Sequence, residues 1–178
     1  MADYLLDTMI LRYWYDDRCP EHAAVLKHVQ HVREPDPDTG YVSRLFVSVV
    51  TRSEIEYGHR VQLMPDLTTQ REFIKFISEQ LPETLEITHH VSEPYGNLRA
   101  WLFNNCSPKN KRSRAKRAEE LVHPTTAKEL GIQENDLWIA AQAVTYNLVL
   151  VTHDRLGNLG DAIKHVTPAL KLEDWAKL

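Results

Sequence analysis

Four acidic residues lie where this 178-residue chain changes from one apparent element to the next, and acids in such positions could hold a metal ion. They are Asp7, Glu54, Asp136 and Asp154. Several carboxylates in one cleft repel one another unless a cation neutralises them. Oxygen ligands without His or Cys favour Mg²⁺ or Mn²⁺. The four acids therefore indicate a site for a divalent cation of this kind.

The segment from Ile132 to Asp154 positions two of these acids. Apolar residues repeat at helical spacing after Asp136, and Leu148 to Val151 is a continuous apolar run, typical of a strand covered on both faces of a parallel sheet. A helix followed by a strand returns the chain to its starting edge, so Asp136 and Asp154 are expected at the same edge of the sheet. In open α/β sheets the carboxyl edge is where binding sites form.

The other two acids follow strand patterns in the first third of the chain. A short apolar run, Tyr4 to Leu6, precedes Asp7, and apolar residues then recur at helical spacing. A second strand is predicted at Leu45 to Val50, and a helix from about Thr51 would carry Glu54 in its first turn. Taken alone, Asp7 suits a helix N-cap and Glu54 an ordinary helix N-terminus. Four such acids at one sheet edge favour a single site over four coincidences.

The remaining patterns complete an α/β chain. Helices are predicted at 21–33, at 67–81 and after Pro94, with short strands at 85–87 and within the tail that ends near Trp175. Turn-forming residues predict surface loops at 34–44 and 104–128. The expected fold is a three-layer α/β/α domain with a mainly parallel central sheet. A chain of this length predicts one domain, 1–178, with both loops as insertions.

Composition excludes several other classes. No apolar run reaches transmembrane length and the N-terminus lacks the features of a signal peptide, so a cytoplasmic protein with no membrane role is expected. The two cysteines, Cys19 and Cys106, indicate neither a disulfide framework nor a thiolate zinc site. The adjacent His89 and His90 point in different directions, which favours a solvated turn over a metal site.

A basic run interrupts an otherwise acidic chain of net charge −4. The phosphates of a nucleic-acid backbone bind such a dense group of positive charges with release of counterions, and the candidate substrate contacts are Lys111, Arg112 and Arg114. A charge run is equally typical of a solvated loop, so both interpretations stay open. The run comprises Lys109, Lys111, Arg112, Arg114, Lys116 and Arg117.

Four blocks of the sequence resemble the signature blocks of PIN-domain nucleases, above all the VapC-type toxins of toxin–antitoxin pairs. The blocks are YLLDT from Tyr4, SVVTRSE from Ser48, NDLWIAA from Asn135 and LVTHD from Leu150, and they follow the family's order along nearly the whole chain. The resemblance implies a Mg²⁺- or Mn²⁺-dependent endoribonuclease that acts on RNA, forms a homodimer and is inhibited by a cognate antitoxin. It also implies that Asp7, Glu54, Asp136 and Asp154 are catalytic metal ligands, with the Thr152 hydroxyl beside them for substrate.

At one position, Met9, the chain departs from the family pattern, and that position bears on the alternative functions. The family usually has Asn or Ser two positions after the first Asp, where this chain has Met9, so one polar contact beside the site is expected to be missing. A haloacid-dehalogenase-type phosphatase would need a second Asp at that same position, and Met9 argues against it. A non-catalytic module of the same fold and a DNA-directed nuclease remain as alternatives, because phosphodiester hydrolysis does not depend on the sugar.

Overall fold

The computed structural model describes residues 2–64, 66–108, 117–123, 125–153, 160, 164, 166 and 170–177. The chain divides into two compact units. The first comprises Met1–Glu86, Leu148–His153 and Leu172–Leu178, and the second comprises Ile87–Asn147 and Asp154–Lys171. Whether both units form the one domain that the sequence predicts stays a prediction.

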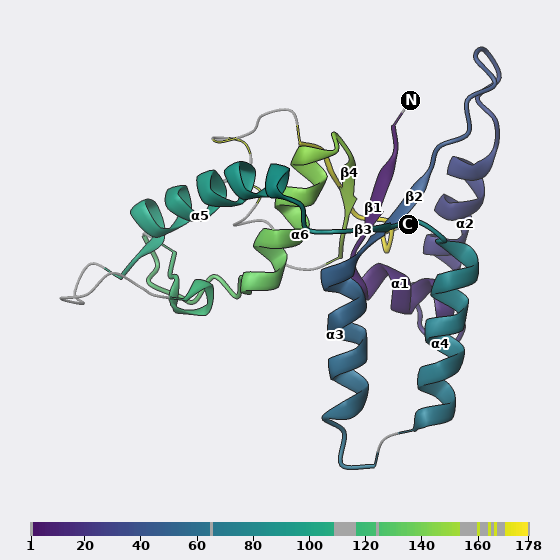
Figure 1. The fold of residues 1–178 in the computed structure, drawn as a ribbon, viewed down its shortest axis with the longest axis horizontal. Helices are drawn as coiled ribbons and strands as arrows, with labels where there is room; N and C mark the ends of the chain where they lie inside the picture. Colours follow the sequence, from purple (N-terminus) through teal and green to yellow (C-terminus); the bar gives the residue numbers. More distant parts are fainter. Residues whose placement is uncertain are drawn as a thin grey trace. The chain divides into compact units, whose positions relative to one another are not determined.

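A parallel sheet of five strands forms the centre of the first unit (Figure 1). The strand order is β3-β2-β1-β4-β5, so the first strand of the chain lies in the middle of the sheet. The predicted parallel sheet is therefore confirmed, and the carboxyl ends of its strands meet at one edge. The strands are β1 (Tyr4–Leu6), β2 (Leu45–Ser48), β3 (Thr84–Leu85), β4 (Val149–Val151) and β5 (Leu172–Glu173).

Both faces of this sheet are buried. Successive strand residues point to opposite faces, and pairing aligns equivalent positions of β1, β2 and β4. One row of aligned residues is Leu6, Val47 and Val151, all at 0% exposure. The neighbouring row, on the opposite face, is Leu5, Phe46 and Leu150, at most 5% exposed. Continuous apolar strands are what a sheet covered on both faces requires.

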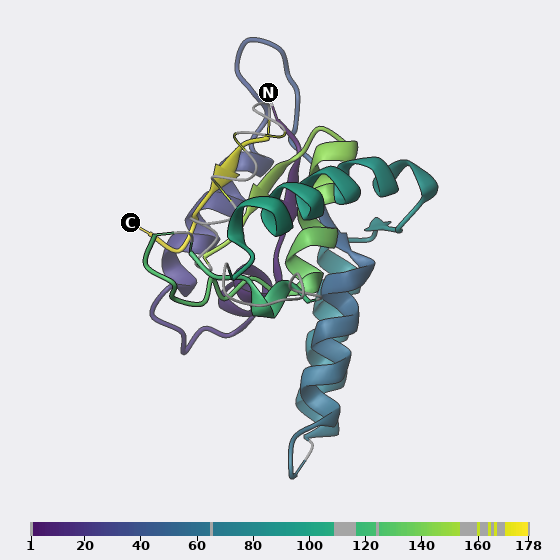
Figure 2. The same cartoon turned by 90° about the vertical axis from the view of Figure 1, so that its left-hand side faces the viewer.

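Four helices accompany the sheet in the first unit. Their buried residues, among them Ile10, Trp14, Val25 and Ile77, form one apolar core with the strands. Helices α3 and α4 run side by side as a hairpin (Figures 1 and 2), and both contact α1. The helices are α1 (Thr8–Tyr15), α2 (His22–Arg33), α3 (Val49–Arg60) and α4 (Leu67–Gln80), which confirms the helices predicted in these regions.

The second strand ends two residues earlier than the sequence predicted. The strand ends at Ser48 and α3 begins at Val49, whereas the sequence predicted a strand to Val50 and a helix from about Thr51. Ser48 is the N-cap of α3, since its hydroxyl accepts a hydrogen bond of 2.9 Å from the backbone N–H of Val50. Consequently Glu54 lies in the second turn of α3, two residues further from the helix start than predicted.

The second unit is helical. Helix α5 packs against α6, and both contact the 3₁₀ turn η1. Both histidines of η1 are exposed, as the predicted solvated turn requires. Helix α5 starts before Pro94 and not after it, because proline is tolerated in the first turn of a helix. The elements are η1 (His89–Val91), α5 (Ser92–Cys106), η2 (Ala118–Glu120) and α6 (Glu134–Thr145).

Two further expectations concern the surface of the chain. The predicted loop at 34–44 contains no helix or strand, and most of its residues are exposed. Within the described residues, no helix combines the length and the apolar character needed to cross a bilayer.

The predicted aromatic anchor of the tail is Trp175, which is 1% exposed. Its ring lies 5.1 Å from that of Tyr4 and stacks on His28, while its Nε1–H donates to Glu173 at 2.8 Å. Replacing Trp175 by Ala is expected to lower the free energy of unfolding by about 3–5 kcal/mol, because a buried ring leaves a cavity. Chemical denaturation measures this loss. Leu63→Ala, at a fully exposed position, is the control and should change stability by less than about 0.5 kcal/mol.

Candidate functional site

Asp7 connects the end of β1 to the start of α1. Its backbone N–H donates to the Val151 carbonyl at 3.1 Å, which joins this turn to the end of β4. Its Oδ1 accepts the N-cap bond from Met9 N at 2.6 Å, and its Oδ2 accepts a hydrogen bond from the Thr152 hydroxyl. Groups from two elements therefore fix the carboxylate. The N-cap reading is confirmed, and it does not exclude a metal, because each carboxylate oxygen has two acceptor lone pairs.

Glu54 is tied to the same edge by a residue that the sequence did not single out. The Thr8 hydroxyl donates to Glu54 Oε2 at 2.5 Å, across 46 positions of the chain. Because Thr8 follows Asp7 directly, this bond brings two of the four predicted acids together. The same bond supplies a polar contact at Thr8, one position before Met9, and the missing polar contact at Met9 itself stays a prediction.

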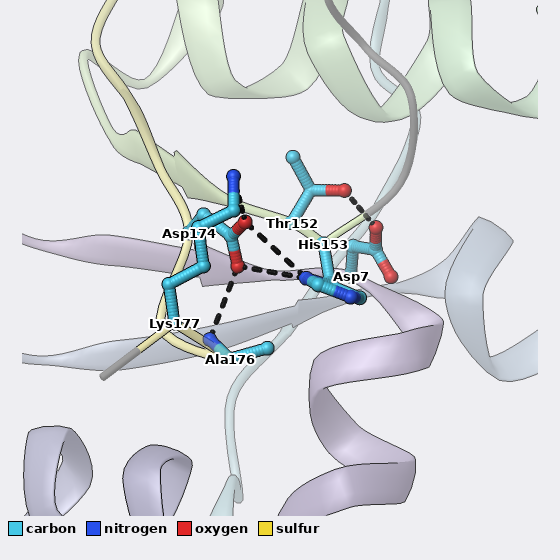
Figure 3. A network of polar contacts seen from close by, with 6 residues as sticks. All are labelled: Asp7, Thr152, His153, Asp174, Ala176 and Lys177. Carbon is cyan, nitrogen blue, oxygen red and sulfur yellow. Dashed lines mark hydrogen bonds and ion pairs between the residues drawn. The ribbon is translucent and has the colours of Figure 1, made fainter. Parts of the chain in front are cut away.

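A second polar network adjoins Asp7 (Figure 3). Thr152 is 5% exposed, and the next residue, His153, pairs through Nδ1 with Asp174 at 3.0 Å. Asp174 also accepts from Lys177 at 2.9 Å. Burial by itself would raise the pKa of Asp174, but the hydrogen bonds from Lys177 and His153 outweigh it and lower that pKa. This network attaches the end of β4 to the tail of the chain.

The hydrogen bond from Thr152 to Asp7 leads to a prediction about metal affinity. Thr152→Val keeps the side-chain shape but removes the hydroxyl that orients Asp7, so the affinity for Mn²⁺ should fall by about 10- to 100-fold. Titration calorimetry measures it. Thr51→Val is the matched control, because the Thr51 hydroxyl is buried without a hydrogen-bond partner and its loss costs no contact. Equal Mn²⁺ affinity in both variants would mean that Thr152 does not position a metal ligand.

Asp136 lies in the second unit, in the first turn of α6, as predicted. It forms a capping box with Gln133, in which Asp136 Oδ2 accepts from the Gln133 backbone N–H at 2.7 Å. This bond fixes the direction of the carboxylate relative to its own helix. The prediction that Asp136 joins Asp7 and Glu54 stays a prediction.

The start of α6 is anchored to α5 by a cluster that sequence reasoning missed. Glu134 pairs with Arg99 at 3.0 Å and accepts a hydrogen bond from the Tyr95 hydroxyl. Burial raises the pKa of Glu134. The Tyr95 ring also stacks on Trp138, with ring centroids 3.7 Å apart. The cluster holds the turn that carries Asp136, and the i, i+4 spacing of Tyr95 and Arg99 was its only signal in the sequence.

Two groups of predicted site residues fall outside the described residues. Asp154 is one, and the basic residues Lys109 to Lys116, which include Lys111, Arg112 and Arg114, are the other. Among the residues that the structure does describe, no three His, Cys, Asp or Glu side chains converge on a common point. The hydrogen bonds thus give two oriented carboxylates, Asp7 held by the Thr152 hydroxyl and Glu54 held by the hydroxyl of Thr8, the residue after Asp7.

Known proteins share this fold at low sequence identity. No protein-family model and no curated protein matches the chain. One chain of VapBC2 from Rickettsia felis, solved with promoter DNA, has a TM-score of 0.63 at 20% identity and covers 97% of this chain and 98% of its own. A chain of VapBC-1 from nontypeable Haemophilus influenzae has a TM-score of 0.62 at 24% identity, and the match covers 98% of this chain and 98% of that one. A chain of FitAcB from Neisseria gonorrhoeae has a TM-score of 0.59 at 18% identity, and the match covers 98% of this chain and 99% of that one. The predicted α/β/α fold is therefore confirmed.

Proposed function

We propose that this chain, a VapC-type PIN-domain protein by its fold, is a metal-dependent endoribonuclease and the toxin of a toxin–antitoxin pair. The observation that carries the proposal is the joining of Asp7 and Glu54 through Thr8 at the carboxyl edge of the parallel sheet. In open α/β sheets that edge is where ligands bind. Carboxylates at one edge repel one another, and a shared cation would offset that repulsion.

The donor groups at this edge fit Mg²⁺ or Mn²⁺. Carboxylates and hydroxyls are hard oxygen ligands, and neither His nor Cys contacts Asp7 or Glu54 in the hydrogen bonds of the described residues. We propose that Asp7 and Glu54 hold the ion, and that Asp136 and Asp154 complete the set of carboxylates. A bound ion would polarise the scissile phosphate and activate the attacking water.

Hydrogen bonds within the chain orient the carboxylates of Asp7 and Glu54. Thr152 and the Met9 backbone hold both oxygens of Asp7, and Thr8 holds one oxygen of Glu54, so these carboxylates do not have to reorganise when a substrate arrives. The Thr8 bond also keeps α3 at a fixed distance from the turn after β1. These positioning bonds distinguish a prepared site from surface acids that happen to lie close together.

The proposed partners follow from the same assignment. The similar structures from Rickettsia felis and Haemophilus influenzae are VapBC complexes. We propose that this chain likewise binds a cognate antitoxin protein and forms a homodimer, and that it acts on RNA in the cytoplasm. For the basic run from Lys109 to Arg117, contact with substrate phosphates and simple solvation both remain open.

The experiment that tests the function compares RNA and DNA. Purified protein is incubated with single strands of identical sequence, with Mg²⁺ or with excess chelator, and the products are separated on denaturing gels. We expect internal cleavage of RNA, only with Mg²⁺. Cleavage of DNA at an equal rate would favour the DNA-directed alternative, and no cleavage of either strand with Mg²⁺ or Mn²⁺ would favour a non-catalytic module.

A further inference from the structure

A groove opens directly beside the paired acids, entirely within the first unit. Its volume is about 540 Å³, within the range of about 300–1,000 Å³ that is usual for ligand sites. Thr8 and Glu54, which are joined by a hydrogen bond in the candidate site, belong to its lining. Its walls are α1, α3 and α4, which contact one another (Figure 1). The groove is therefore continuous with the proposed catalytic edge.

The two walls continue the helices that carry the acids. Arg12 follows Thr8 by four residues on α1, and Gly58 follows Glu54 by four residues on α3. Residues four apart share a helix face and lie about 6 Å apart along the axis. Arg12 and Gly58 both line the groove. They therefore lie in the groove lining one helical turn along α1 and α3 from Thr8 and Glu54.

Arg12 is the cation of the groove that is available for a ligand. It is exposed, and its guanidinium makes no hydrogen bond or ion pair with another described side chain. The other arginine of the lining, Arg18, donates two hydrogen bonds to Asp16, which lower the pKa of Asp16 to about 2. The Asp66 carboxylate caps α4 through Thr68 and Thr69. Arg12 thus offers a guanidinium that can bind a phosphate, in a lining that also contains the carboxylates of Glu54 and Asp66.

Gly58 has no structural reason to be glycine. It lies inside α3, where glycine costs about 1 kcal/mol relative to alanine. Its φ is not in the left-handed region, and a Cβ built on it would meet no atom within 4 Å. Because Gly58 has no side chain, it leaves space in the groove near Glu54. Tyr15 and Phe73 also line the groove, with ring centroids 4.7 Å apart, and are called its aromatic floor below.

We propose that this groove, lined by Arg12, Gly58, Tyr15 and Phe73, binds the nucleotides next to the scissile phosphate of a single-stranded RNA. The inference rests on the proposed nuclease function and adds a binding subsite to it. Arg12 binds a backbone phosphate, and the aromatic floor accepts a base, the combination by which proteins hold single strands. Gly58 provides the clearance for the sugar-phosphate chain.

The test measures the affinity for a fluorescein-labelled single-stranded oligoribonucleotide, with Ca²⁺ in place of Mg²⁺. Arg12→Gln should weaken binding about tenfold, as expected for one charge-assisted hydrogen bond. The slope of log affinity against log salt should become less steep by roughly 0.7, the value for one phosphate contact of a single strand. Arg71→Gln is the matched control, because Arg71 is exposed on α4 and does not line the groove. It should leave the slope unchanged.

A second variant separates blocking from loss of charge. Gly58→Leu adds a side chain to the groove lining at a position where a Cβ meets no atom within 4 Å, and it should weaken RNA binding at least tenfold, while the melting temperature stays equal or rises slightly. Gly96→Leu is its control, since Gly96 is an exposed helical glycine with equal free space, in α5 and outside the groove lining. If Arg12→Gln and Gly58→Leu both bind RNA like the wild type, the inference is wrong.

Cleavage with Mg²⁺ is scored separately, which distinguishes the two proposals. Wild-type cleavage together with unchanged RNA affinity in both groove variants would overturn the subsite and leave the nuclease standing. Binding that is weakened in both variants, without any cleavage by the wild type, would support the subsite and overturn the nuclease. If Gly58→Leu weakens binding of a protein inhibitor but not of RNA, the groove belongs to a protein partner and the inference is wrong.

Discussion

Asp7→Asn is expected to reduce the rate of RNA cleavage by about 10²- to 10³-fold or more, because a carboxylate that holds the metal supplies several kcal/mol of transition-state stabilisation. The fold should persist. Asn is as good an N-cap as Asp, so with the amide oxygen at the Oδ1 position the hydrogen bond from Met9 N survives, and the amide NH2 at the other position can donate to the Thr152 hydroxyl instead of accepting from it. Initial rates with excess Mg²⁺, together with a circular dichroism melt, measure both properties.

Asp17→Asn is the matched control for this substitution. Asp17 is an exposed acid just beyond α1, and it loses the same charge without touching Asp7 or Glu54. Its cleavage rate should equal that of the wild type. A rate for Asp7→Asn within a factor of about three of the wild type would remove Asp7 from the catalytic machinery, and with it the assignment of the site.

Mg²⁺ is expected to raise the melting temperature of the wild type. At a concentration of 100 times the dissociation constant, a ligand that binds only the native state adds about 2.7 kcal/mol. For a chain of this size, that corresponds to a rise of roughly 5–10 °C. Asp136→Asn should lose most of the rise if Asp136 belongs to the same metal site, while the amide oxygen can still accept the capping bond from Gln133. Differential scanning calorimetry measures the shift.

This melting experiment also tests how Asp136 relates to the first unit. Asp17→Asn should keep the full Mg²⁺ shift, which controls for the loss of one negative charge. An equal shift in Asp136→Asn and the wild type would place the ion away from Asp136, and Asp7 with Glu54 would then need other partners. A shift in neither protein would mean that no Mg²⁺ binds specifically to the native state.

Local patterns in the sequence were sufficient to predict most elements. Apolar residues at helical spacing predicted α1, α4 and α6, and the continuous apolar run that became β4 predicted a strand buried on both faces. The end of β2 was misjudged because Val49 and Val50 favour strands by propensity, while the hydroxyl of Ser48 caps a helix. Side-chain capping decided the boundary against propensity.

Contacts between distant segments were beyond the reach of such patterns. The strand order β3-β2-β1-β4-β5 depends on pairing between segments more than 100 residues apart, which no local period encodes. The sequence predicted that Asp7 and Glu54 share an edge, but not that Thr8 links them. The groove of Arg12 and Gly58 arises from the packing of α1, α3 and α4, so no spacing within one helix could indicate its volume.

The most direct test of the central claim, that a carboxylate-bound ion acts on the scissile phosphate of RNA, replaces one atom of the substrate. Sulfur substituted for a non-bridging oxygen at the cleaved bond weakens contact with hard Mg²⁺ much more than with softer Mn²⁺. We expect the phosphorothioate RNA to be cleaved far more slowly than normal RNA in Mg²⁺, and the rate to be largely restored by Mn²⁺. Equal rates for both diastereomers of the modified RNA and for normal RNA in Mg²⁺ would contradict a metal ion acting at the phosphate.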